Sequence, residues 1–454
     1  MDSGRDSNAA RRFWCHPRRR GGGSDADAGR VLTRGSEVRA PAMGGDLTSK
    51  TADGRLKLVL IIGGLSAFGP LSIDLYLPAL PSLTRDLGGS PSLAQLTLTA
   101  CLLGLAAGQL VAGPLSDALG RCRPLFVGLA AYALASLLCA LAPSVGVLVG
   151  LRLIQGTAAA AGIVVARAVV RDVYEGSDIA RFLALTMLIS GLAPILAPMA
   201  GGQLLRLTSW RGAFVVLAAI GLLLLAAAAL GLPETLPPER RRSGGLRETL
   251  TTFRGLVADR MFMGYALSSG LAMGASFTYV SGAPFVLEDI YGVSPQAFGL
   301  IFGTNAVSIL LLGQIGRRLV GRVGSRRLLM AGLGIASAGG LLLLASVTFG
   351  VGLAGVLPGF LLVVSSVGLN SPNATALALA DHAHQAGSAA ALLGMLYYAV
   401  GAVVAPLAGL GGPHTAVPMA VVIALLDAAA VTTFVLFTRS RSVRAVPEAV
   451  GPHT

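Results

Sequence analysis

The chain has 454 residues, of which 54% are hydrophobic and only 13% are charged, and its mean hydropathy is +0.73. A soluble domain is about one quarter charged, so this composition excludes an ordinary soluble enzyme and indicates an integral membrane protein. Apolar runs long enough to cross a bilayer as helices recur along the chain, whereas the alternation of a membrane β-barrel is absent.

Residues 1–56 are rich in Arg, Gly, Ser, Asp and Ala, and predict a disordered, basic cytoplasmic tail. Met43 opens MGGDLTSK within it, and we expect translation to start there rather than at Met1. An N-terminal bundle at 57–232, a cytoplasmic linker at 233–259, a C-terminal bundle at 260–437 and a cytoplasmic tail at 438–454 follow. Each bundle is predicted to have six membrane-spanning helices, which makes the fold all-α. The twelve spans are 57–79, 93–115, 124–142, 145–166, 181–204, 211–232, 260–284, 297–316, 328–348, 351–373, 387–410 and 415–437.

The placement of basic residues predicts the orientation. With the N-terminus in the cytoplasm, 31 of the 35 Lys and Arg residues lie in inner loops or tails. Three lie in outer loops, at Arg85, Arg206 and Arg211, and Arg152 lies within a span. The positive-inside rule therefore predicts that both termini are cytoplasmic. The net charge of +13 then faces anionic lipid headgroups, and no nucleic-acid partner is expected.

An internal repeat indicates two pseudo-symmetric halves. SDALGRCRPL follows the second predicted span and VGRVGSRRLL follows the eighth. At an offset of 204, identical residues recur as Gly120 and Gly324, Arg123 and Arg327, and Leu125 and Leu329. A half-chain repeat of this kind is typical of secondary transporters.

Asp74, in the segment SIDLYLPALP, lies near the outer end of the first predicted span. Desolvation disfavours a charged carboxylate, so such a residue can take a proton from one side and release it on the other. An interfacial Asp that meets water or a helix end is the alternative. Asp427 in the last span is a second acid, but no motif surrounds it.

Arg152 lies in the fourth predicted span, where a guanidinium group costs at least ~2.5–3.5 kcal/mol at mid-helix. Gln155, three residues later, lies on the same helical face and can orient it. The alternative is an Arg that extends to the interface from near the helix end.

Several motifs resemble those of the major facilitator superfamily. GPLSDALGRCRP, from Gly113, is similar to its signature loop, and RLIQGTAAA, from Arg152, is similar to its fourth-span motif. APILAPMAGG resembles its fifth-span antiporter motif, with Ala197 where the pattern has Gly. SIDLYLPALP, GAPFV and LPETLPPERR resemble, more narrowly, the bicyclomycin- and chloramphenicol-resistance subfamily of drug/proton antiporters.

The resemblance implies a role for each motif. Proton coupling is implied for Arg152, with Gln155 and Gly156 completing the fourth-span motif, and Asp74 is expected to share this role because of its position in an apolar span. A leak-proof rocking contact is implied for Pro198, Gly201 and Gly202, for which plain small-residue packing is the alternative. A cytoplasmic latch is implied for Gly113, Asp117, Gly120, Arg121 and Arg123, for which an ordinary surface ion pair is the alternative. The second copy has Gly321 in place of Asp117, so the latch is expected in one half only.

Aromatic and amide side chains are candidates to line a substrate cavity between the halves. They are Tyr76, Gln95, Tyr279, Phe285, Asn305 and Tyr397. Each of them is equally compatible with ordinary packing. His382 and His384 flank Ala383 beside Asp381, but a solvated inner loop explains them, and no metal, cofactor or catalytic residue is expected.

We therefore expect a monomeric, multi-pass protein of the cytoplasmic (inner) membrane that exports drug-like small molecules in exchange for protons. It would confer multidrug, bicyclomycin-like or chloramphenicol-like resistance. The alternative is a transporter of the same fold that exports a natural metabolite or imports a nutrient. An embedded enzyme is disfavoured because all five histidines lie in predicted tails or loops.

Overall fold

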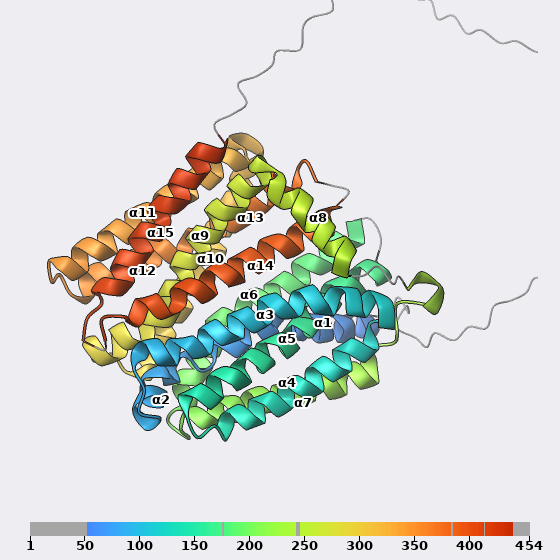
Figure 1. Ribbon diagram of the computed structural model, residues 1–454, viewed down its shortest axis with the longest axis horizontal. Coiled ribbons are helices and arrows are strands. Elements are labelled where there is room, and N and C mark those ends of the chain that lie inside the picture. The colour runs from blue at the N-terminus through green and yellow to red at the C-terminus, as the bar shows by residue number, and fades with distance from the viewer. Residues whose placement is uncertain (1–51, 175–176, 242–245, 383–384, 413, 439–454) are drawn as a thin grey trace, which may run out of the picture. The chain divides into compact units, whose positions relative to one another are not determined.

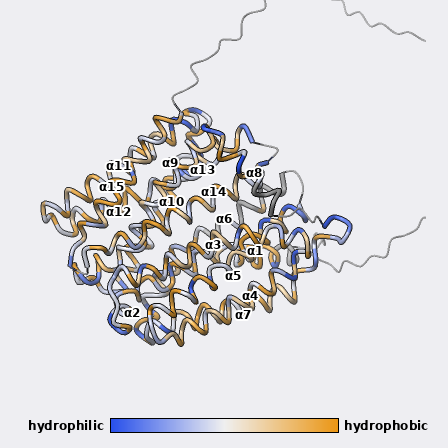
Figure 2. Tube along the Cα trace, viewed as in Figure 1, coloured by the Kyte–Doolittle hydropathy of each residue, from blue (hydrophilic) through white to orange (hydrophobic). Residues whose placement is uncertain are grey.

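The computed structural model describes residues 52–174, 177–241, 246–382, 385–412 and 414–438, so both predicted tails and Met43 lie almost wholly outside it. Within these ranges every regular element is a helix (Figure 1). In the part of the chain that the structure describes, eleven segments are long and apolar enough to cross a membrane. Figure 2 shows hydrophobic residues along the helices and hydrophilic ones mainly at their ends. The twelve-span count and the cytoplasmic termini stay predictions.

The first set of helices precedes the linker. Its members are α1 (Ala52–Asp74), η1 (Leu77–Ala79), α2 (Leu80–Asp86), α3 (Pro91–Leu119), α4 (Cys122–Ala140), α5 (Val145–Val173), α6 (Ser177–Leu204) and α7 (Trp210–Gly231). Within this set α3 packs against α5, α4 against α5 and α7, and α1 against α6.

The second set follows the linker. Its members are α9 (Arg260–Pro284), η3 (Phe285–Ile290), α10 (Pro295–Val323), α11 (Ser325–Thr348), α12 (Leu353–Ser365), α13 (Val367–Leu379), α14 (Ala386–Val404), η5 (Ala405–Gly409) and α15 (Val417–Thr438). Here α9 packs against α14 and α15, and α11 packs against α12. The two sets meet where α6 contacts α10 and where α3 lies beside α14 (Figure 1).

The internal repeat is also visible in the backbone. Gly120 ends α3 and Gly324 ends α10, and both have a positive φ, at 91° and 83°. Residues other than glycine rarely adopt a positive φ. The tight turn after each helix therefore explains why both halves have glycine at this position. Helix ends on this side are called inner ends below, following the predicted orientation, and the opposite ends are called outer ends.

The structure corrects three predicted elements. The first span was predicted as one helix to residue 79, but α1 ends at Asp74 and short helices continue to Asp86. Pro78 and Pro81 lack the amide hydrogen that a continuous helix needs here. The tenth span divides at Ser366 into α12 and α13. The linker, predicted as a polar stretch, contains η2 (Pro238–Arg240) and α8 (Leu246–Ala258), in which Phe253 and Leu256 are buried.

Candidate transport site

Asp74 is the last residue of α1, directly before the break in the first span. Its side chain is only 7% exposed, and among the described residues none forms a hydrogen bond or ion pair with it. Shortly after Asp74, η1 contacts α9 and α10 of the second set. An ionised carboxylate without a counter-charge is costly in such an interior, so Asp74 is a candidate proton-binding group close to where the two sets meet.

Arg152, on α5, is completely buried. Its Nη2 donates a hydrogen bond of 2.9 Å to the carbonyl oxygen of Ser72, and its Nη1 donates to Oε1 of Gln155. The guanidinium carbon lies 4.4 Å from the ring centre of Tyr76 and 5.6 Å from that of Phe214. The alternative of an Arg that extends to the interface is therefore wrong: the side chain is held within the first set, where it binds Ser72, which precedes Asp74 by two residues.

Further polar side chains connect this arginine to its neighbours. Gln155 Nε2 donates to the hydroxyl of Ser136 at 2.6 Å. The hydroxyls of Ser72 and Tyr132 are 2.7 Å apart. Sequence reasoning missed Ser72, Tyr132 and Ser136, and the only available signal was that each is a polar residue within an apolar span. The resulting network joins α1, α4 and α5 next to the break in the first span.

The glycines of the fourth- and fifth-span motifs lie at close backbone contacts. Gly156 faces the carbonyl of Cys101 on α3, and Gly201 faces the carbonyl of Leu75 in the break of the first span. A methyl group added to Gly202 would lie 2.5 Å from the carbonyl oxygen of Pro295, at the start of α10. No larger residue fits without a shift. The predicted rocking role of these residues remains a prediction.

Pro198 belongs to the same contact between the two sets. A methyl group on Gly299 of α10 would lie 2.7 Å from the carbonyl oxygen of Pro198. Gln296 Nε2, in the first turn of α10, donates to the carbonyl of Gly202 at 2.8 Å. The fifth-span motif is therefore one of the parts of α6 that touch the other set.

At the inner ends, Arg121 is the centre of a charged network. It forms ion pairs of 2.5 Å with Asp117 and 2.8 Å with Asp172 on α5. Desolvation opposes its charge, but the two carboxylates outweigh this effect and raise the pKa of Arg121. The side chain is only 7% exposed, so an ordinary surface ion pair does not describe it.

Glu234, in the segment after α7, completes this network. It accepts hydrogen bonds from the backbone amides of Arg121 at 2.8 Å and Cys122 at 3.1 Å, and from Leu236 at 3.0 Å. Desolvation alone would raise the pKa of Glu234, but these amides and nearby Arg241 lower it overall. Sequence reasoning used LPETLPPERR only as a family resemblance and did not single out Glu234.

Two members of the predicted latch have no comparable contacts. A methyl group on Gly113 would meet no atom within 4 Å. Arg123 is exposed, and the described residues offer it no ion pair. Gly120, in contrast, has its Cα close to Glu234, because an added methyl group would lie 2.5 Å from Oε2. The observed network joins α3, α5 and the segment after α7, all on the first-set side.

The six predicted cavity residues are mostly internal. Tyr397 is partly exposed and lies 2.8 Å from the hydroxyl of Ser269. The other five are buried: Tyr76, Gln95, Tyr279, Phe285 and Asn305. Asn305 donates to the Tyr279 hydroxyl at 2.9 Å, and Gln95 donates to the carbonyl of Ser281 at 3.1 Å. In this structure these contacts stabilise packing within and between the sets.

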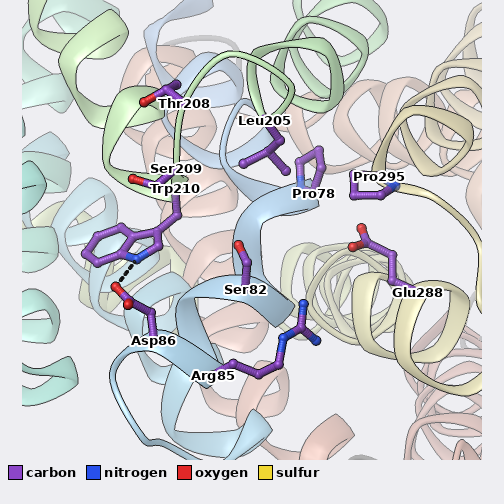
Figure 3. Close-up of a pocket in the computed structure, with 10 residues that line it drawn as sticks. All are labelled: Pro78, Ser82, Arg85, Asp86, Leu205, Thr208, Ser209, Trp210, Glu288 and Pro295. Carbon is purple, nitrogen blue, oxygen red and sulfur yellow. Dashed lines mark hydrogen bonds between the residues drawn. The ribbon is translucent and has the colours of Figure 1, made fainter.

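A pocket of about 410 Å³ lies instead at the outer ends (Figure 3). Its lining is drawn from both sets: Pro78, Ser82, Arg85, Asp86, Leu205, Thr208, Ser209, Trp210, Glu288 and Pro295. None of the six predicted cavity residues contributes to it.

The predicted histidine loop lies partly outside the described residues, because His384 is not covered. His382 Nε2 is 2.9 Å from a carboxylate oxygen of Asp259. Desolvation would raise the pKa of Asp259, but backbone amides of α9 and His382 lower it overall. Among the described residues no three His, Cys, Asp or Glu side chains could hold a metal ion together.

Comparisons with known proteins identify similar chains. The chain is 44% identical over 375 residues to the uncharacterized MFS-type transporter YdgK of Bacillus subtilis, covering 82% of this chain and 93% of that protein. It is 32% identical over 361 residues to a bicyclomycin resistance protein homolog of Haemophilus influenzae, covering 80% and 91%. It is 34% identical over 302 residues to a chloramphenicol resistance protein of Pseudomonas aeruginosa, covering 65% and 71%.

Solved structures show the same fold. The nucleoside transporter NupG superimposes with a TM-score of 0.67 at 14% identity, covering 85% of this chain and 99% of that one. A D-xylose-proton symporter superimposes with a TM-score of 0.66 at 16% identity, covering 85% and 98%. The sequence profile of the Major Facilitator Superfamily matches residues 60–406. The predicted resemblance is confirmed: the chain is a multi-pass transporter of the cytoplasmic membrane and belongs to the Major Facilitator Superfamily.

Proposed function

We propose that this transporter exports drug-like small molecules in exchange for protons, by alternating access between its two sets of helices. The observation that carries the proposal is Asp74, a buried carboxyl group at the break of the first span with which no described residue forms a hydrogen bond or ion pair. Relatives named for bicyclomycin, chloramphenicol and multidrug resistance support drug-like substrates.

In this proposal Asp74 is the residue that binds the proton. It lies in the first set shortly before η1, which contacts α9 and α10 of the second set, so its charge lies close to where a substrate would contact both sets. If proton and drug favour different charge states of Asp74, each changes the affinity for the other, and this reciprocity couples the two fluxes.

Arg152 takes a positioning role in this scheme. It binds the Ser72 carbonyl rather than the Asp74 carboxylate, so it fixes the backbone of the break. Gly201 approaches the same break from α6. Asp74 is thus positioned by α5 on one side and α6 on the other, and α6 in turn contacts α10 of the second set.

The present structure corresponds, in this proposal, to a state closed towards the periplasm. Hydrogen bonds join the sets in their outer halves, from Gln95 to Ser281 and from Gln296 to Gly202. Thr99 adds a bond of 2.8 Å to the carbonyl of Ala402. The Arg121 network would tighten the cytoplasmic side in the opposite state, as the resemblance implies.

The test is chloramphenicol transport by purified protein in liposomes with an imposed proton gradient. We expect the drug to move in the direction opposite to the protons. This drug flux should be lost when an uncoupler is added, and it should also be lost in Asp74→Asn. Asp427→Asn is the matched control, because Asp427 is also a buried acid within a span. Drug flux that ignores the uncoupler, or that survives in a correctly inserted Asp74→Asn protein, contradicts the proposal.

A further inference from the structure

One ion pair joins the two sets of helices at their outer ends. Arg85, in the last turn of α2, places Nη1 2.8 Å from Oδ1 of Asp289 in η3. These positions are 204 residues apart, the offset of the internal repeat. Each residue therefore belongs to the outer end of the first span in its own half, and the pair lies where the two halves meet.

Arg85 and the adjacent Asp86 have their charged partners in different sets of helices. Asp86 accepts a 2.8 Å hydrogen bond from the indole nitrogen of Trp210 (Figure 3) and lies 3.4 Å from Arg211, both in the first set. Arg85 instead faces the second set, where Glu288 lines the same pocket (Figure 3). Among the described residues, Glu288 Oε1 is buried without a hydrogen-bond partner.

The surroundings allow the pair to open and close. The Arg85 side chain is 66% exposed and that of Asp289 is 22% exposed. The pocket of about 410 Å³ lies beside Arg85, so this pair can separate without displacing tightly packed side chains around the arginine. Water can replace each lost hydrogen bond, which makes the interaction weak enough to be reversed in every cycle.

We propose that Arg85 and Asp289 form a reversible lock that favours the state closed towards the periplasm. Its place in a transport cycle rests on the proposed function, but its effect on the distance between the outer ends can be measured without substrate. A pair of this exposure changes an equilibrium by about two- to fivefold. The lock therefore biases the two states and does not fix either of them.

The experiment measures distances between spin labels by double electron–electron resonance in lipid nanodiscs. The labels replace Leu207, between α6 and α7, and Phe349, between α11 and α12, which are 86% and 82% exposed. The four native cysteines are first replaced by serine. We expect Arg85→Gln to lower the ratio of closed to open molecules about two- to fivefold.

Two further variants make the test specific to this pair. Arg85→Asp places two acids together and should open the outer ends further, and adding Asp289→Arg should restore the original ratio. Arg211→Gln is the matched control, because it removes a neighbouring ion pair that lies within the first set. We expect it to leave the distances unchanged.

The outcomes separate the lock from the proposed function. Unchanged distances in Arg85→Gln, or a charge exchange that restores nothing, overturn the lock. If Arg85→Gln does not fold, the double variant Asp289→Asn with Glu288→Gln repeats the measurement from the other side. If distances respond as expected while chloramphenicol flux proves independent of protons, the proposed function fails and the lock stands.

Discussion

Replacing Arg152 by Met should loosen the break of the first span without changing the volume of the side chain greatly. The substitution removes two hydrogen bonds from a charged donor, to the Ser72 carbonyl and to Gln155. Each such bond is worth ~1.5–3 kcal/mol. It also removes the contact with the Tyr76 ring, worth ~1–2 kcal/mol when desolvated. Because these contacts share one side chain, we expect a total loss of ~3–5 kcal/mol rather than the full sum.

Hydrogen–deuterium exchange at the amides of Leu75, Tyr76 and Leu77 measures this loss directly. A local destabilisation of ~3 kcal/mol accelerates exchange at the break by about 100-fold. Gln155→Leu removes only one of the two bonds and should show a smaller increase. Amides in the middle of α4 serve as the internal reference. If transport by Arg152→Met is lost while exchange at the break is unchanged, Arg152 acts through its charge and not as a clamp.

Two other substitutions test separate parts of the structure. Gly201→Ala should cost ~1–3 kcal/mol of stability and reduce transport, because the added methyl group meets the Leu75 carbonyl. Gly113→Ala should be tolerated, since no atom lies within 4 Å of an added methyl group. Thermal unfolding and drug flux of the two variants check this. Glu234→Gln should lower stability by ~0.5–2 kcal/mol at pH 7, because it weakens the acceptor of three backbone amides. The folded-state pKa of Glu234 is lowered, so its stabilising effect is complete above the ordinary value of 4.5 and is lost as the pH falls through the folded-state value. The wild type and Glu234→Gln should therefore converge in unfolding experiments at acidic pH, and a gap that persists there contradicts the assignment.

The helical fold could be predicted from hydropathy because each span is an independent apolar run. Asp74 and Arg152 could be singled out for the same reason, since a charge within such a run is conspicuous in the sequence alone. The spacing of Arg152 and Gln155 also sufficed, because residues three apart share a helical face. These features depend on neighbouring residues of one helix.

Contacts between distant segments were beyond this reasoning. Glu234 caps a turn more than 100 residues earlier in the chain, and no local pattern indicates that pairing. Tyr76 was predicted to line a cavity, but the helix break turns its ring onto Arg152. The offset of 204 was visible in the inner loops, yet the pairing of Arg85 with Asp289 depends on how the two halves meet.

Proton release on drug binding tests the role of Asp74 most directly. Calorimetric titration of the purified protein with chloramphenicol, in buffers of different ionisation enthalpy, measures the protons exchanged on binding. The account predicts release of about one proton by the wild type and none by Asp74→Asn, with drug still bound. Equal proton release by both proteins would contradict the assignment of Asp74 as the coupling residue.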